Sequence, residues 1–447
     1  MKTPVRIPLV TEPWGILQTL RTARRNVLEI LPELTVKQPI VSGTTGKRWH
    51  MLCDPEGLRQ VLKDRVEDYP KSLVTRNMLR PAIGDSMFIA EGAHWRWQRR
   101  AAAPVFNPRN VSNLGPVMSH AADRAVDRLM KHDGMVCDIY EEMVTATFEV
   151  ISDVTFSADT GFSRDEMHVA INRYIDQTAR LSLLDILGMP DWVPRPGRLF
   201  SGNALKRMKS VADDVVDARR KRPVPDMPDL LDLLLAGEDS DTRRRMNTAE
   251  LRDNLLTFIV AGHETTALAL SWALYLCAFD PVIQERARTE AQERLQDRTA
   301  VAEDCPHLPF IRQIIDETMR LYPPAPLLSR TALKCDILCG REIRAKDTVA
   351  IPVYALHRNE LLWNNPNAFD PDRFSDPSAI DRFAYLPFGA GPRICIGAGF
   401  AVQEAVIILA TLLSKFRFTA VSGRDPKPVM ILTLRPEGGV WLNVEKL

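Results

Sequence analysis

Cys395 is the side chain in this sequence that is best placed to hold a metal. It stands in the stretch FGAGPRICIG, residues 388–397, where Gly389 and Gly391 let the backbone turn tightly and approach a flat partner. The stretch that follows, 398–413, has a helical composition, so the thiol is predicted at a helix N-terminus, where unpaired N–H groups stabilise a thiolate. An isolated cysteine is most often a small buried apolar residue, but these neighbours favour an anionic sulfur ligand.

The stretch AGHETT, residues 261–266, carries a second set of groups that can do chemistry. The carboxylate of Glu264 can take protons from solvent and pass them inward as a general acid and base. The hydroxyl of Thr265 can bond to its own helix, which is the usual arrangement for a threonine in mid-helix, or to a ligand beside it. Together the two side chains indicate proton transfer at a buried site.

The element that must carry this pair is a long helix from Asn247 to Asp280, ended by Pro281. Its length also suits a membrane span, but the charge of Glu264 near its centre is costly in lipid and favours a buried core helix. A zinc protease motif is excluded, because alanine stands four residues after His263, where the second ligand is required.

Both stretches resemble signatures of the cytochrome P450 haem-thiolate monooxygenases. The haem-binding signature of that family is Phe, two residues, Gly, one, Arg, one, Cys, one, Gly, and its places are filled here by Phe388, Gly391, Arg393, Cys395 and Gly397. The AGHETT stretch is similar to the oxygen-activation motif of the family. The resemblance extends over most of the chain from about residue 35, with the principal motifs in order.

The resemblance implies that Cys395 is the proximal axial ligand of haem b, iron protoporphyrin IX. A thiolate ligand pushes electron density onto the iron and favours O–O cleavage. By the same resemblance, Phe388 packs beside the sulfur and Arg393 pairs with a haem propionate. On the distal face, Ala261 and Gly262 approach the haem.

The resemblance also gives Glu264 and Thr265 their catalytic roles. Glu264 supplies protons, and Thr265 assists their use in the reduction of dioxygen.

A basic stretch, HWRWQRR, places Trp95 and Arg99 on one face of a predicted helix, at positions i and i+4. A basic helix face is most often simply solvated. The spacing resembles the pattern of the family that contacts haem propionates, and Arg suits bidentate binding of carboxylates. The resemblance gives Arg330 the same role.

Glu317 and Arg320 stand in ETMR, at the i,i+3 spacing of a helical ion pair, which is usually a minor surface feature. The family joins such a pair to a later arginine, here Arg373 in DPDRF. The resemblance thus implies a structural network that does not touch substrate. The substrate pocket that the resemblance implies is apolar and contains Met87, Phe88, Ala261, Ala325, Leu327, Leu328, Ile431 and Leu432.

Composition bounds the remaining possibilities. The chain has 447 residues and a net charge of +1, with 58 basic and 57 acidic side chains, so nothing in the whole-chain charge favours a nucleic acid partner. The 7 cysteines include no Cys-x-x-Cys pair, which excludes a disulfide framework, a zinc ribbon or an iron–sulfur site and favours a reducing cytoplasm.

Local patterns predict further elements. An amphipathic helix is expected in 14–31, two short strands around a turn in 39–52 and a loop in 73–92. Helices without strands are expected in 110–222, a small sheet after 325 and a terminal hairpin turning at Gly438–Gly439.

The expected fold is mainly α with a minor β portion. We expect a single large haem-enclosing domain over residues 35–447, preceded by an N-terminal arm over 1–34. The first residues contain Pro4 and Pro8 and no long apolar stretch, so we expect no transmembrane anchor. The chain therefore looks like the soluble, bacterial type of the family, cytoplasmic and monomeric.

The resemblance implies a monooxygenase that inserts one atom of O2 into a C–H bond or a double bond of a hydrophobic substrate. The sequence contains no Gly-x-Gly-x-x-Gly fingerprint, so electrons from NAD(P)H must arrive through a partner. We expect a ferredoxin or flavodoxin with its reductase, docking on the Cys395 side through Arg96 and Arg100.

Two alternatives stay open. A peroxide-driven haem enzyme of the same fold would not need Glu264 and Thr265. A non-catalytic haem sensor would bind apolar ligands without forming product. Fatty acids, terpenoids, steroids and aromatic compounds all suit an apolar pocket.

Overall fold

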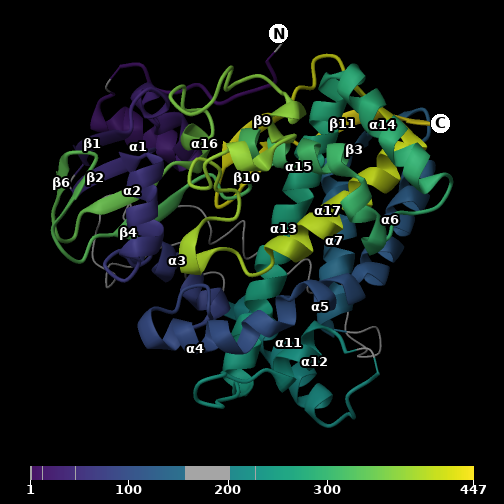
Figure 1. Ribbon diagram of the computed structural model, residues 1–447, viewed down its shortest axis with the longest axis horizontal. Coiled ribbons are helices and arrows are strands. Elements are labelled where there is room, and N and C mark those ends of the chain that lie inside the picture. The colour runs from purple at the N-terminus through teal and green to yellow at the C-terminus, as the bar shows by residue number, and fades with distance from the viewer. Residues whose placement is uncertain (1–2, 13, 46, 157–201, 227) are drawn as a thin grey trace.

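The structure is a computed structural model that describes residues 3–12, 14–45, 47–156, 202–226 and 228–447. Within these residues helices predominate, and the small sheets gather largely on the side of the molecule where the chain begins (Figure 1). The prediction of a mainly α fold with a minor β portion is confirmed.

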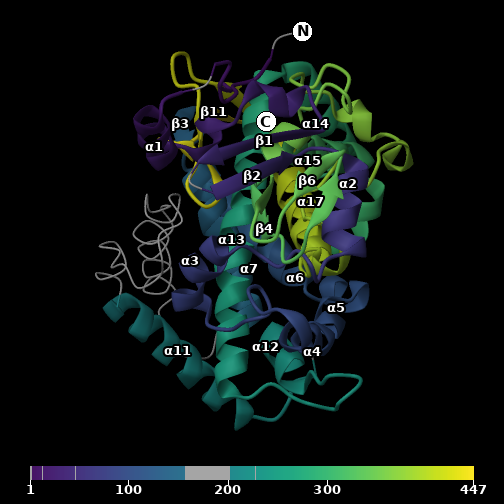
Figure 2. The same cartoon turned by 90° about the vertical axis from the view of Figure 1, so that its left-hand side faces the viewer.

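The long helix α13 (Thr248–Phe279) runs through the middle of the molecule (Figures 1 and 2). Its first turn is fixed by a reciprocal cap: Glu250 N–H donates to Asn247 Oδ1 at 2.9 Å, and Asn247 N–H donates to Glu250 Oε2 at 3.0 Å. Its last turn ends at Asp280, which caps the following α14 (Pro281–Leu295). The predicted helix is confirmed at both ends.

Helices surround α13 on several sides. It packs against α3 (Leu73–Ile83), α7 (Ile139–Phe156), α11 (Gly202–Arg220), α15 (Pro309–Leu321) and α17 (Ala398–Lys415). The remaining described α-helices are α1 (Ile16–Arg25), α2 (Pro55–Arg59), α4 (Gly92–Ala102), α5 (Pro108–Asn113), α6 (Gly115–Met130), α12 (Leu230–Ala236) and α16 (Val353–Leu356).

The largest described sheet has the strand order β1-β2-β7-β4 and covers a second, smaller core. Only its β2–β7 pair is parallel. Its strands are β1 (Ile40–Thr45), β2 (Lys47–Leu52), β4 (Leu328–Thr331) and β7 (Thr348–Ile351). The other described strands are β3 (Met135–Asp138), β5 (Asp336–Leu338), β6 (Arg341–Ile343), β8 (Phe416–Ala420), β9 (Lys427–Met430), β10 (Leu434–Glu437) and β11 (Trp441–Lys446).

The first residues of the chain pack onto the body. Tyr322 Oη–H donates to Val5 O at 2.6 Å, Ile7 N–H donates to Tyr354 Oη at 2.9 Å, and the side chain of Ile7 is buried in the main core. The helix expected in 14–31 is observed as α1 followed by a 3₁₀ turn. The division of the chain at residue 34 remains a prediction.

The prediction of a loop in 73–92 is wrong for the first half of that range, which forms α3. Ser72 caps this helix by accepting a hydrogen bond from Thr75 N–H at 3.3 Å, and the helix stops before Gly84, whose φ is +54°. Pro81 lies within this helix, close to its end. Because α3 buries Leu79, Ala82 and Ile83, tertiary packing supplies the stability that the sequence pattern did not indicate.

The expectation of no strands in 110–222 is wrong at β3, and residues 157–201 of that range lie outside the described residues. The hairpin expected at Gly438–Gly439 is also wrong. The strand β3 pairs with β11, and β11 also pairs with β8, so the chain leaves β10 at these glycines and enters a different sheet. The hairpin of this region is β9–β10. Gly439 has a φ of +89°, and a Cβ there would collide with the Asp138 carboxylate, so the glycine serves a close crossing of chains.

Among the described helices, α17 alone has the length and hydropathy to cross a membrane, and 67% of that stretch is buried within the fold. The helices α13 and α14 pass the same test only together, as a pair bent by 115°. Such burial is typical of core helices in a folded domain.

Candidate functional site

Cys395 lies in a tight loop directly before α17. Its N–H donates to Phe388 O at 2.9 Å, and Gly389 and Gly391 have φ values of +72° and +69°. A Cβ on Gly391 would collide with the carbonyl oxygen of Leu62, which lies in the π-helical turn Gln60–Asp64. The glycine is therefore needed both for the backbone conformation and for this close packing.

The sulfur of Cys395 is accessible to solvent but lies deep within the fold. The protein atoms that crowd it raise the pKa of the thiol, whereas a hydrogen bond from Gly397 N–H and the charges of Arg99 and Lys71 lower that pKa. A cation that binds to the sulfur would favour the thiolate further, as expected for a metal ligand.

Four cationic side chains surround this loop, and a single carboxylate, Glu91, lies among them. Burial lowers the pKa of each cation, and Arg330, whose pKa falls to about 10, is also affected by the charge of Arg393. The cations are Lys71, Arg99, Arg330 and Arg393. Among the described residues, this cluster holds more positive charge than negative charge.

Arg393 is held on three sides. Its guanidinium forms an ion pair with Glu91, donates to Ala90 O at 2.9 Å and lies 4.4 Å from the centre of the Trp95 ring. Trp95, which was predicted to contact a propionate, therefore supports Arg393 through a cation–π contact with its ring in this structure. The side chain of Arg393 is only 7% exposed, so its direction is fixed.

Arg330 is the least satisfied member of the cluster. It is 6% exposed, its Nη1 donates to Ser329 O at 3.0 Å, and its Nε is buried without a hydrogen-bond partner among the described residues. A buried donor without an acceptor is costly, so this group indicates that an anion belongs here. Two propionate carboxylates of a haem fit both the open donor and the excess of positive charge.

Lys71 and Glu91 belong to this cluster but were missed by the sequence analysis. Lys71 forms a β-bridge with Arg330, and its Nζ lies 3.7 Å from the centre of the Phe88 ring. Its N–H donates to Glu91 Oε1 at 3.0 Å. The spacing of Lys71 and Glu91 in the sequence does not mark them as site residues. The position of Glu91 directly before a basic helix is the one available signal for it.

The AGHETT residues divide between two sides of α13. Ala261 and Thr265 are accessible, and Thr265 Oγ1 donates to Ala261 O at 2.7 Å, whereas His263, Glu264 and Thr266 are buried. The carboxylate of Glu264 forms an ion pair with Arg435 of β10. The predicted acid and alcohol are therefore neighbours in sequence that face different surroundings.

Gly262 makes its close approach to another helix. A Cβ at this position would lie 3.3 Å from Ile151 Cδ1 of α7. The predicted approach of Gly262 to a haem face remains a prediction.

Glu404 connects α17 to α13 and was also missed. Its side chain is 2% exposed and hydrogen-bonds with Thr266, the residue after Thr265. Burial raises the pKa of this carboxyl well above its usual value, whereas the hydrogen bond with Thr266 lowers it. The signal was present in the sequence, because Glu404 is the acid within an otherwise apolar helix.

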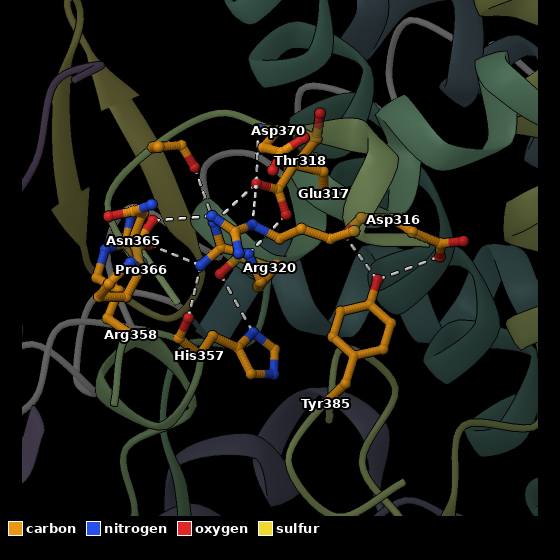
Figure 3. Close-up of polar contacts among 12 residues, drawn as sticks. Asp316, Glu317, Thr318, Arg320, His357, Arg358, Asn365, Pro366, Asp370 and Tyr385 are labelled. Atoms are coloured by element: carbon orange, nitrogen blue, oxygen red, sulfur yellow. Dashed lines mark hydrogen bonds and ion pairs between the residues drawn. The ribbon is translucent and has the colours of Figure 1, made fainter. Parts of the chain in front are cut away.

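The predicted network of Glu317, Arg320 and Arg373 is assembled in the structure (Figure 3). Arg320 Nε and Nη2 donate to Glu317 at 2.6 and 2.8 Å, and Arg373 Nε lies 3.4 Å from Glu317 Oε1. The remaining donors of Arg320 reach the carbonyl oxygens of His357, Pro366 and Ala368 at 2.7–3.0 Å. Every N–H of this buried guanidinium therefore has an acceptor.

The residues predicted to line a substrate pocket differ in exposure. Met87 is 6% exposed and lies in the main core, where its N–H donates to Asn254 Oδ1 at 3.0 Å. Phe88 is 38% exposed beneath Lys71. Accessible or partly buried positions are found for Ala261, Ala325, Leu327, Leu328, Ile431 and Leu432.

The two arginines predicted to dock a redox partner both form ion pairs within the chain. Arg96 pairs with Glu67, and Arg100 Nε lies 2.5 Å from Asp239 Oδ1. Their side chains are 44% and 36% exposed, so they remain reachable from solvent.

These features define a class of protein. A cysteine at a helix start, an excess of buried cations over carboxylates and an accessible threonine within a long core helix suit a flat, anionic metal cofactor bound through sulfur.

Comparison with known proteins supports the same class. The family described as Cytochrome P450 matches residues 8–443. The Cytokinin hydroxylase of Arabidopsis thaliana is 33% identical over 436 residues, which cover 94% of this chain and 84% of the relative. The Cyclooctatin synthase of Streptomyces melanosporofaciens is 29% identical over 418 residues, which cover 92% and 90%.

Among solved structures, a cytochrome P450DA heme domain matches with a TM-score of 0.83 and 25% sequence identity, over 100% of this chain and 99% of that chain. The chain belongs to the cytochrome P450 family, and it is a haem-thiolate monooxygenase.

Proposed function

We propose that Cys395 holds the iron of haem b in this monooxygenase. The arrangement that best supports this assignment is the Cys395 loop beside a cluster of cations that outnumber the carboxylates around them and include the unpaired Nε of Arg330. In the bound state, the haem supplies the activation of O2 and the transfer of one oxygen atom to a hydrophobic substrate, by hydroxylation or epoxidation.

The cations have defined tasks in this proposal. Arg330, Arg393, Arg99 and Lys71 bind the propionates, and Trp95 holds Arg393 in place from the side of its ring. Phe388, which is partly buried and packs on the main core, lies beside the sulfur.

Thr265 and Glu264 act on protons. Thr265 presents its hydroxyl at an accessible position of α13 and can donate or accept a proton there, while Glu264, which is buried beside Arg435, supplies protons. Glu317, Arg320 and Arg373 act only on the structure, because they hold each other and the backbone.

The redox partner, the location, the oligomeric state and the domain bounds are proposed from the family and from the sequence. Electrons from NAD(P)H reach the enzyme through a ferredoxin or flavodoxin with its reductase. The enzyme acts as a cytoplasmic monomer whose catalytic domain spans residues 35–447 behind the arm 1–34. Its substrate is a hydrophobic small molecule.

The test uses the purified, haem-loaded enzyme with a compound that shifts its haem absorption spectrum. Incubation with reduced ferredoxin, reductase and ¹⁸O2 should give product that carries one labelled oxygen atom. Product formed with peroxide but not with the reduced partner would instead establish a peroxide-driven enzyme. Binding without product under both conditions would establish a ligand-binding protein.

A further inference from the structure

Arg435 reaches the carboxylate of Glu264 from a distant part of the chain. Its guanidinium forms an ion pair with Glu264 Oε1, and the two side chains are 17% and 4% exposed. Nothing in the sequence marked this residue, because the two partners lie on β10 and α13.

The position of Arg435 is fixed by its neighbour in β10. Trp272 Nε1–H of α13 donates to Leu434 O at 3.1 Å, and Leu434 N–H donates to Pro324 O at 3.1 Å. The strand is therefore anchored to the same helix that carries Glu264. This anchoring makes the ion pair a consequence of the fold and not of a flexible side chain.

Arg435 also lies near a second carboxylate, which is exposed. The charge of Arg435 lowers the pKa of Glu141 on α7, whereas burial and Asp138 raise that pKa more strongly. The guanidinium of Arg435 therefore pairs with a buried acid, Glu264, and is close enough to an acid at the surface, Glu141, to act on its charge.

An arginine suits this place because its guanidinium stays charged at all accessible pH values. A carboxylate as buried as that of Glu264 is costly without a positive partner, and removal of the partner leaves an uncompensated charge. On α13, Glu264 follows Ala261 by three residues and directly precedes Thr265, so the ion pair holds the acid within one helical turn of both accessible positions.

We propose that Arg435 is the positioning residue for Glu264: it holds the carboxylate beside β10, where Glu264 accepts protons from solvent before it releases them toward Thr265. Each cycle moves a proton from water to a carboxylate oxygen of Glu264 and from there to the Thr265 side of the helix. This inference rests on the proposed role of Glu264.

The test compares Arg435→Met and Arg435→Lys in the haem-loaded enzyme. We expect Arg435→Met to lower the product formed per electron pair by about tenfold and to increase the solvent deuterium isotope effect on turnover. Arg435→Lys restores a positive partner and should recover most of both values. Substrate affinity should change little, because Arg435 pairs with the buried Glu264 and is itself only 17% exposed.

A second readout does not depend on activity. In a double-mutant cycle of thermal unfolding, Arg435→Met should lower the melting temperature of the parent but should lower it much less in a Glu264→Gln background. Arg417→Met is the control, since Arg417 pairs with Glu445 on the exposed edge of β8 and β11 at 3.7 Å. It should alter none of these quantities.

Wild-type product yield and isotope effect in Arg435→Met, together with additive melting shifts, would overturn the positioning role while leaving the proposed function intact. Loss of product yield in Arg435→Met without rescue by Arg435→Lys would overturn it as well. A parent enzyme that forms no product with reduced partner would refute the proposed function itself, and the unfolding cycle would still decide whether Arg435 and Glu264 are coupled.

Discussion

At the scale of single residues, the site is recognised by buried cations that outnumber the carboxylates around them. Arg330 is buried with an open donor, and Arg393 beside it shares one carboxylate with Lys71. Such an arrangement is unfavourable in an empty protein and favourable once anions are bound, because like charges at close range repel each other. The residues that bind a cofactor thereby make the protein less stable without it.

We expect Arg330→Leu to stabilise the haem-free protein but to weaken its hold on haem. The unfolding temperature of the haem-free protein should rise, because a buried cation and its unpaired donor are removed. Haem should be lost about tenfold faster, since a charge-assisted hydrogen bond to a propionate contributes about 1.5–3 kcal/mol.

Calorimetry of the haem-free protein and the rate of haem transfer to a scavenger protein measure the two effects. Arg424→Leu, an exposed arginine beside Trp441, is the control. A haem-free protein that becomes less stable, with haem release unchanged, would contradict the assignment of Arg330 to a propionate.

At the scale of elements, the network around Arg320 joins α15 to the segment that leads to Cys395. His357 Nδ1–H donates to Arg320 O at 3.2 Å (Figure 3). Its Nε2 accepts a hydrogen bond from Leu386 N–H at 2.8 Å. His357 therefore carries its proton on Nδ1, because the backbone N–H of Leu386 can only donate and Nε2 must accept. The Cys395 loop begins shortly after Leu386, so its position depends on this network.

Glu317→Ala should therefore destabilise the protein by about 3–5 kcal/mol, because it leaves the buried guanidinium of Arg320 without its carboxylate. Denaturant unfolding of the haem-loaded protein measures the loss. Glu33→Ala removes an exposed ion pair with Lys37 and should cost less than about 1 kcal/mol. Equal effects of the two substitutions would show that the Arg320 network does not stabilise the fold.

His357 predicts a pH dependence of stability. Burial, followed by the charge of Arg320, lowers the pKa of its imidazole to about 3 from an ordinary value of 6.5. Between these values the unfolded chain binds the proton and the folded chain does not, so stability is complete above about pH 6.5 and falls as the pH drops. The slope from this group is at most about 1.4 kcal/mol per pH unit.

Unfolding free energies of the parent and of His357→Asn between pH 4 and pH 8 test this dependence. The variant should be less stable at pH 8 and should lose less further stability on acidification. His307→Asn, at an exposed position, should keep the slope of the parent. Parallel curves for the parent and His357→Asn would show that another group causes the acid sensitivity.

At the scale of the whole molecule, residues from distant parts of the chain meet around the sulfur. Lys71 precedes α3, Arg99 lies on α4, Arg330 lies on β4, and Arg393 and Cys395 stand before α17. The fold brings them together because α13 supports helices on several sides and the β1-β2-β7-β4 sheet carries Arg330. A partner that delivers electrons is expected on the outer side of α4.

Charge reversal on α4 tests this expectation. Arg96→Glu and Arg100→Glu together should slow the first electron transfer from reduced ferredoxin several-fold at low salt and have less effect at high salt, because steering is screened. Stopped-flow reduction measures the rate, and substrate titration should be unaffected. A rate that equals that of Arg417→Glu at every salt concentration would remove the docking proposal.

The sequence predicts local features of this fold better than distant ones. The ends of α13 were predictable, because Asn247, Glu250 and Pro281 act within a few residues of each helix end. The pairing of β3 with β11 was not, since it depends on a partner hundreds of residues away. The same holds for the site: Cys395 has a distinctive stretch around it, whereas the contact of Arg435 with Glu264 exists only in the folded chain.

The central claim is that the sulfur of Cys395 is the iron ligand, and the absorption spectrum of the reduced, carbon monoxide-bound protein tests it most directly. The parent should show the band of thiolate ligation, and Cys395→His, which offers another ligand in the same loop, should bind haem without that band. If Cys395→His kept the thiolate band, the sulfur would come from another residue and the assignment of the site would be wrong.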